Sequence, residues 1–278
     1  MAAQSFSPGL LPERSVLRTD GPEAEHFLHN LLTADIEGLK AGGASYAALL
    51  TPQGKMLFDV FVIRDGEGFL IDCATSQQAE LVKRLGFYKL RAKVAISDLV
   101  DREVGVSPER PAMGLAYADP RDGAMGFRVI APKGSLPEGS GYHGLRIRHG
   151  LADTDADLGS GEFFPHEANL DQLGAVSFAK GCYVGQEVVS RMEHRATARS
   201  RILPVRLDGP GPGKGTEIVS GGKKVGTLLS AKGCDALALL RLDRLAEAEA
   251  PLLTAGVGTR VIKPRWARYT VPRARQGD

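Results

Sequence analysis

A single cysteine stands in the short glycine-rich stretch KGCYVGQE, residues 180–187. Gly181 and Gly185 flank Cys182, and this spacing predicts a sharply shaped loop that holds the thiol in one direction. Lys180 and nearby arginines would favour the thiolate electrostatically, which makes Cys182 a candidate nucleophile or soft-metal ligand. The same pattern also fits a small side chain packed in a tight turn, because free cysteine is often buried.

The segment that follows the cysteine is locally basic. Its charged residues are Lys180, Arg191, Arg195, Arg199 and Arg201, with His194, against Glu187 and Glu193. This pattern is typical either of a solvated face or of a surface that captures a polyanion or a carboxylated ligand, for which the arginine fork is well suited. Both interpretations remain open at this point.

Asp59 is a second candidate site residue. It interrupts the otherwise apolar run MLFDVFVI, which predicts a strand buried on both faces. A carboxylate there needs a partner, so Asp59 is either a hydrogen-bonded structural residue or a ligand contact.

The elements that would position these residues are mixed. Residues 24–32 have the apolar spacing of a helix, after Asp20 and Pro22. The later patterns predict a hairpin of strands at 45–50 and 56–64, a strand at 69–73, a helix at 76–85, a strand at 93–98, further strands between 103 and 133, and a helix from 142. We therefore expect an α+β fold.

The run LDGPGPGKG, residues 207–215, is the strongest linker signal in the chain. Short strands at 216–220, 224–230 and 236–242 follow it and favour a small β-barrel. We expect a ligand-binding α+β region over residues 1–203 and a C-terminal barrel domain over residues 204–278.

The composition limits the partners, metals and location that we expect for this chain. A net charge of +2 over 278 residues suggests neither a nucleic-acid nor a membrane partner, and no apolar run is long enough for a membrane helix. Three scattered cysteines argue against a disulfide framework, and no zinc-ligand spacing occurs, so we expect no permanent metal. Cys73 and Cys234 fit ordinary buried thiols. The first dozen residues lack a basic region, and we expect a cytoplasmic protein.

The run FPHEANLDQLGAVSFAKGCYVGQEVVSR, residues 164–191, resembles the signature of the YgfZ family of folate-binding proteins that assist iron–sulfur cluster assembly, relatives of mitochondrial cluster-maturation factors. HNLLTADI, YAALLTPQGKMLFDVFVI, FYKLRAKVAISD and GGKKVG resemble the family in the same order. The resemblance implies the fold of the glycine-cleavage T-protein, with three subdomains around a channel that takes tetrahydrofolate. The signature residues of the family correspond here to Lys180, Cys182 and Gln186, with Tyr183 and Glu187 completing the loop.

Two departures from the T-protein pattern stand out. T-proteins carry adjacent aspartates where this chain has Phe58 and Asp59, and Arg148 stands where a glutamate meets the pterin ring. An arginine cannot accept the N–H donors of a pterin, so we expect a reduced folate to bind weakly or in another orientation. The residues expected around the ligand are Asp59, Arg148, Tyr183, Gln186, Glu187 and Arg191.

Taken with the resemblance, the sequence predicts an accessory factor for assembling or repairing iron–sulfur clusters in client enzymes, with cluster carriers as further partners. Cys182, with Lys180 beside it, would either ligate iron or a cluster transiently or attack an electrophilic adduct. One alternative is a folate-dependent aminomethyltransferase, with Asp59 as its carboxylate. Another is a tRNA-modification-linked factor that uses the arginine-rich segment.

Overall fold

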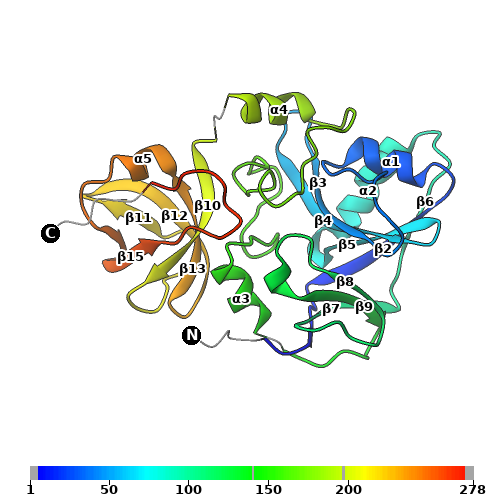
Figure 1. Cartoon of the computed structure of the whole chain (residues 1–278), viewed down its shortest axis with the longest axis horizontal. Coiled ribbons are helices and arrows are strands. Elements are labelled where there is room, and N and C mark those ends of the chain that lie inside the picture. The colour runs from blue at the N-terminus through cyan, green and yellow to red at the C-terminus, as the bar shows by residue number, and fades with distance from the viewer. Residues whose placement is uncertain (1–5, 140, 196–197, 273–278) are drawn as a thin grey trace.

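The computed structural model describes residues 6–139, 141–195 and 198–272 (Figure 1). A five-stranded antiparallel sheet lies near the N-terminus, in the order β3-β4-β5-β2-β6. Its elements are β2 (Arg14–Asp20), α1 (Ala24–Leu31), β3 (Ala44–Leu50), β4 (Met56–Asp65), β5 (Gly68–Ala74), α2 (Gln78–Lys89) and β6 (Ala95–Asp98). A short 3-10 helix, Thr75–Gln77, leads into α2.

The two faces of this sheet pack against different partners. Alternate residues of β4, such as Phe58 and Val60, belong to a core that includes the apolar faces of α1 and α2. The intervening positions, such as Phe61 and Ile63, belong to a second core shared with the rest of the molecule. Because side chains alternate along a strand, Asp59 faces the second core together with Phe61.

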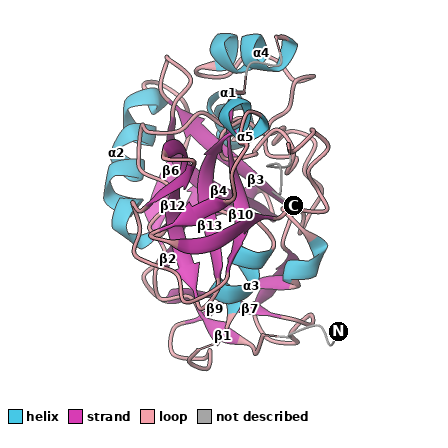
Figure 2. Cartoon of the chain, turned by 90° about the vertical axis from the view of Figure 1, so that its left-hand side faces the viewer, coloured by secondary structure: helices cyan, strands magenta, loops and turns pink. Residues whose placement is uncertain are grey.

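A smaller sheet, in the order β1-β7-β9-β8, contributes to that second core. It is built from β1 (Gly9–Leu10), β7 (Arg102–Ser107), β8 (Leu115–Ala118) and β9 (Phe127–Pro132), with a 3-10 turn at Gly123–Met125. Helix α3 (Tyr142–Arg148) follows and lies against the barrel strands β12 and β13. Residues 149–185 then run through turns that bury Leu151, Leu170 and Leu173. Helix α4 (Gln186–His194) follows, at the top of both views (Figures 1 and 2).

The C-terminal part is a closed barrel in the strand order β10-β13-β12-β11-β14-β15. Its elements are β10 (Ser200–Leu207), β11 (Glu217–Ser220), β12 (Lys223–Lys232), β13 (Asp235–Arg241), α5 (Leu242–Ala246), β14 (Leu252–Thr254) and β15 (Val257–Val261). Figure 2 views the molecule from the barrel side. Leu203, Val205 and Leu240 are among the residues that fill its core.

The glycine- and proline-rich run at 207–215 is not the interdomain linker that the sequence predicts. Strand β10 precedes the run and pairs with both β13 and β15, so residues 207–215 form a loop inside the barrel. The barrel thus begins at Ser200, and residue 203, the expected boundary, lies within its first strand.

Candidate functional site

Cys182 is exposed on the loop that enters α4. Its neighbour Tyr183 is buried, so the loop turns one side chain outward and the next inward. The other two cysteines differ from it: Cys73 is buried in β5, and Cys234 is half-buried rather than fully buried as predicted. Burial raises the pKa of the Cys73 thiol to about 12, which removes it as a nucleophile.

Lys180 fixes one end of this loop. Its ammonium donates hydrogen bonds to the carbonyl oxygens of Leu32, at 2.6 Å, and Ala34, at 2.9 Å, and to that of His29. These carbonyls lie at or just beyond the C-terminus of α1, where a cation is favoured. Burial lowers the pKa of Lys180 to about 8, although Asp35 and Glu37 oppose the shift. The geometry therefore makes Lys180 an anchor for the loop.

Gly185 fixes the other end. It adopts φ +82°, and a Cβ there would lie 2.6 Å from the carbonyl oxygen of Thr51 and 3.0 Å from the Cα of Gly54. Gly54 is equally close-packed, since a Cβ on it would lie 2.9 Å from Val188. The turn between β3 and β4 and the start of α4 therefore meet backbone to backbone, which only glycine permits.

Tyr183 points into the interior. Its ring lies 5.1 Å from the Lys180 ammonium, and its hydroxyl has no hydrogen-bond partner among the residues that the structure describes. Burial raises the pKa of Tyr183 to about 12. A buried hydroxyl without a partner is costly, so it marks a place where a donor or acceptor from water or a ligand would be stabilising.

A network of buried charges lies where the second core meets β5. Asp72 is fully buried and accepts hydrogen bonds from Arg14 at 2.7 Å and from Arg128 at 2.6 Å. Tyr117 donates to the same carboxylate at 3.1 Å. Burial alone would raise the pKa of Asp72, but the two guanidinium groups outweigh it and lower the pKa. Every group here has a partner, which is the arrangement of a structural network.

Asp59, by contrast, is a buried carboxylate that is only partly hydrogen-bonded. Tyr46 donates to its Oδ2 at 3.0 Å, whereas Oδ1 is buried without a hydrogen-bond partner among the described residues. Burial raises the pKa of Asp59, and Arg14 opposes the shift. A cavity of about 10 Å³ borders it, lined also by Gln77 and residues 154 and 158–160. That volume holds about one water molecule and does not fit a pterin ring.

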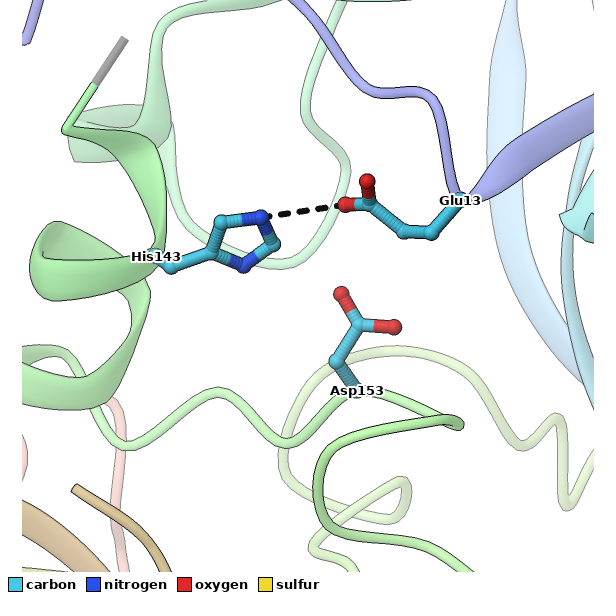
Figure 3. A group of neighbouring side chains, drawn as sticks. All are labelled: Glu13, His143 and Asp153. Atoms are coloured by element: carbon cyan, nitrogen blue, oxygen red, sulfur yellow. Dashed lines mark ion pairs between the residues drawn. The ribbon is translucent and has the colours of Figure 1, made fainter. Parts of the chain in front are cut away.

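One group of side chains has the ligand types of a metal site: Glu13, His143 and Asp153 (Figure 3). His143 Nε2 lies 3.0 Å from Glu13, and its Nδ1 accepts a hydrogen bond from Arg146 at 3.2 Å. Arg14 and Arg146 also lie within 3.9 Å of Asp153. Because these guanidinium groups already neutralise the Asp153 carboxylate, the group is unfavourable for a cation.

A second group, His166, Asp171 and Glu193, shares this limitation. Arg201 binds Asp171 through two hydrogen bonds, at 2.5 and 3.0 Å. His166 is buried and lies 3.1 Å from Glu193 of α4. The contact ties the far end of α4 to the body of the molecule.

The structure places the other predicted ligand residues in separate regions. Arg148 is one-third exposed and lies 3.6 Å from Asp235 of β13, whereas Arg146, two residues earlier on α3, points inward to Asp157 at 2.6 Å. Glu187 and Arg191 pair at 2.6 Å on the exposed face of α4, and Gln186 is half-buried at its start. Asp59 alone of the set lies in the charged interior.

The sequence reasoning missed several residues that shape this region. Arg14, Asp72 and Arg128 form the interior network, and nothing in the local patterns of the two arginines singles them out. A signal existed for Asp72, which interrupts the apolar strand β5 as Asp59 interrupts β4. Helix α4 was also missed, although Val188, Val189 and Met192 have helical spacing.

Comparison with known proteins places this geometry in a family. Residues 199–269 match the family model described as CAF17, C-terminal beta-barrel domain. The human protein named iron-sulfur cluster assembly factor IBA57, mitochondrial, is 32% identical, over 84% of this chain and 77% of its own length. A homologue from Chaetomium globosum is 31% identical, over 90% of this chain and 76% of its own length. The chain therefore belongs to the IBA57 family of iron–sulfur cluster assembly factors.

The fold comparison agrees with the predicted fold class. The structure of the glycine cleavage system aminomethyltransferase T from Bartonella henselae superposes with a TM-score of 0.77, covering 98% of this chain and 88% of that protein. Identity is only 14%, so the match shows the fold alone. The predicted α+β T-protein fold with a C-terminal barrel is confirmed.

The predicted cytoplasmic location is wrong, because both relatives are named as mitochondrial proteins. The prediction rested on the absence of a basic N-terminal region. Targeting segments are removed from mature proteins, so that absence does not report where a folded chain works. None of the helices within residues 6–139, 141–195 and 198–272 combines the length and the apolar character of a membrane span.

Proposed function

We propose that this chain is an accessory factor in the assembly or repair of iron–sulfur clusters in client enzymes, and that Cys182 ligates iron or a cluster transiently. The observation that carries the proposal is the exposed thiol on a loop fixed at both ends by contacts with backbone atoms. Thiolates are the usual ligands of iron–sulfur clusters, and one cysteine cannot hold a cluster alone. The remaining ligands would come from a client enzyme or a cluster carrier.

The loop geometry supports this role in physical terms. A ligand that is shared between two proteins must be reachable by the partner and must not lose its direction when the partner leaves. Lys180 and Gly185 supply the second property through backbone contacts that leave the thiol exposed. The cavity at Asp59 is lined by no residue of the segment 180–191, so it does not provide a binding pocket for an electrophilic adduct beside Cys182.

Mixing the protein with a cluster-loaded carrier and following the visible absorption and paramagnetic resonance of the cluster tests the proposal. The Cys182→Ser variant should lose the spectrum of the shared cluster and fail to restore cluster enzymes in cells that lack the factor. Cys234→Ser, which alters a half-buried thiol on the barrel, is the matched control and should behave as the parent. Full rescue by Cys182→Ser would refute the assignment.

A reduced folate is proposed as a weak ligand only. The unpartnered Oδ1 of Asp59 could accept an N–H donor, but the space beside it fits water and not a pterin, and Arg148 faces the barrel. Titration calorimetry with tetrahydrofolate should give a dissociation constant of about 1 μM or weaker, corresponding to about 8 kcal/mol or less. Nanomolar binding would overturn this argument.

The fold favours one second candidate, an aminomethyltransferase. Such an enzyme needs a preorganised negative group beside the developing cation. Phe58 lies in the helix-facing core, so Asp59 is the only carboxylate that these two positions offer, and burial raises its pKa. We expect no transfer from a lipoyl carrier to tetrahydrofolate in a coupled assay. Turnover like that of a T-protein would replace the cluster-factor proposal.

A further inference from the structure

The three most exposed large apolar side chains of the described residues lie within one short stretch of the chain. Leu90, Val100 and Phe87 are 88%, 76% and 62% exposed, and the next most exposed is only 45%. All three lie within residues 87–100, around the end of α2 and the strand β6. Figure 1 shows α2 and β6 on the side of the molecule opposite the barrel.

Leu90 is held outward by an unusual turn. The N–H of Ala92 donates to the carbonyl of Lys89 at 2.7 Å, and Leu90 has φ +42° and ψ −104°. These values are near those of the first central residue of a type II′ turn, a position that glycine normally fills. A leucine there is unfavourable for folding, and its side chain is almost fully in water. Strain of this kind is expected where a residue serves binding rather than stability.

Basic residues flank Phe87 and Leu90 in the chain, whereas Val100 stands between Asp98 and Asp101. Residues 78–93 contain five basic residues, Lys83, Arg84, Lys89, Arg91 and Lys93, against one acidic residue, Glu80, which gives a net charge of +4. Glu80 pairs with Lys83 and Arg84 at 3.7 Å. Arg91 and Lys93 directly precede β6 in the chain, and both are exposed.

The edge of the five-stranded sheet completes the surface. Strand β6 is last in the strand order, and its described neighbour is β2 alone. Its residues Ala95, Ser97 and Asp98 are exposed. An edge strand presents backbone N–H and C=O groups that another chain can pair with. Lipids and nucleic acids cannot form that ladder, whereas an extended polypeptide can.

We propose that residues 87–100 form a docking surface for an extended acidic polypeptide segment, which adds to the edge of β6 and covers Phe87 and Leu90. Acidic side chains of the segment would meet Arg91 and Lys93, and its apolar side chains would cover the exposed apolar groups. The surface is separate from the Cys182 loop, and the proposal does not rest on the cluster-assembly role.

The test uses the full chain and a short fluorescent peptide that alternates glutamate with isoleucine. Binding is followed by anisotropy, and hydrogen exchange is followed at Ala95–Asp98. The peptide should bind saturably and protect these amides from hydrogen exchange. Its affinity should fall as the salt concentration rises. A peptide with lysine in place of glutamate, and one methylated on alternate backbone nitrogens, should each bind at least about tenfold more weakly. No saturable binding of the acidic peptide would overturn the proposal.

Variants separate the docking role from a structural one. Leu90→Gly should leave the urea midpoint of unfolding unchanged or raise it, because glycine suits the turn. The same variant should bind the peptide about tenfold more weakly. The double variant Arg91→Glu, Lys93→Glu should bind the peptide more weakly still. The matched control Met113→Ser removes a 45% exposed apolar side chain elsewhere and should leave binding unchanged. Binding that survives Leu90→Gly, or a preference for vesicles of phosphatidylserine or for an oligonucleotide over the peptide, would overturn the proposal.

Discussion

The Cys182 loop and the charged interior around Asp72 differ in how their polar groups are exposed and held. Around Asp72 each charge is buried and is held by side chains of opposite charge. In the loop the thiol of Cys182 is exposed. The backbone on either side of it is held by the hydrogen bonds of Lys180 to carbonyl oxygens and by the close approach of Gly185 to Gly54. The interior therefore contributes to stability through its pairs, whereas the loop leaves its thiol available to a partner.

The comparison predicts that breaking the interior costs most. Asp72→Asn leaves Arg14 and Arg128 buried without their shared counter-charge, so the free energy of unfolding should fall by about 3–5 kcal/mol. Urea denaturation measures this. Asp243→Asn, which removes a surface pair with Arg241, is the control and should cost less than about 1 kcal/mol. Equal costs would mean that the interior network contributes no more than a surface pair.

Disturbing the backbone contact of Gly185 should cause the next largest loss of stability. Gly185→Ala introduces a Cβ 2.6 Å from the Thr51 carbonyl oxygen at a positive φ. Gly174→Ala provides the control, since it also has a positive φ (+70°) but nothing within 4 Å. The control should cost about 1–2 kcal/mol from φ alone, and Gly185→Ala about 1–3 kcal/mol more. If the two variants have the same urea midpoint, the close approach of Gly54 and Gly185 is not a constraint.

Acid should weaken the interior before it affects the loop. Burial alone would raise the pKa of Asp153, but Arg146 and Arg14 outweigh it and lower the pKa from 3.8 to about 2. A depressed folded-state pKa stabilises the protein above pH 3.8, and this contribution is lost as the pH falls through 2. The loss is about 2 kcal/mol. Asp153→Asn should flatten the stability profile between about pH 4 and 2, whereas the exposed control Glu247→Gln should retain it.

Replacing Lys180 should lower the free energy of unfolding less than the changes above, and its effect should be confined to the neighbourhood of the loop. Lys180→Met removes three hydrogen bonds to carbonyls at the end of α1 and should cost about 1–2 kcal/mol. Hydrogen exchange should quicken in α1, and alkylation of Cys182 should change its rate. Lys223→Met on the barrel is the control. An unaltered exchange pattern in α1 would show that Lys180 does not hold the loop.

Sequence patterns predicted the elements whose signal is local. The helix at 24–32 and the hairpin from residue 45 appear as α1, β3 and β4, because their apolar spacing reports one buried face. Long-range features could not be found this way. Strand β10 closes the barrel through pairing with β15, which places the glycine-rich run inside a domain.

The candidate site shows the same division. The glycine-framed cysteine was visible in the sequence, since the motif is contiguous. The role of Lys180 was not, because its acceptors lie about 150 residues earlier in the chain, as the separation of 151 from His29 shows. The directions of Arg146 and Arg148 depend on their positions around α3. They stand two residues apart and therefore point to nearly opposite sides of the helix, Arg146 to the interior and Arg148 to the barrel.

The smallest expected effect distinguishes the exposed loop from the buried helix-facing core most directly. Cys182→Ser exchanges an exposed thiol for a hydroxyl that water can solvate, so the free energy of unfolding should change by less than about 0.5 kcal/mol. Cys73→Ser places a hydroxyl in the buried helix-facing core and should cost about 1–3 kcal/mol. Urea denaturation of both variants, with alkylation rates of the parent, measures the contrast, and Cys182 should react far faster than Cys73. If Cys182→Ser destabilised the fold as much as Cys73→Ser, the thiol would be a packing group, and loss of cluster assembly in that variant would no longer indicate a ligand. A neutral stability change with lost assembly would assign the thiol to function alone.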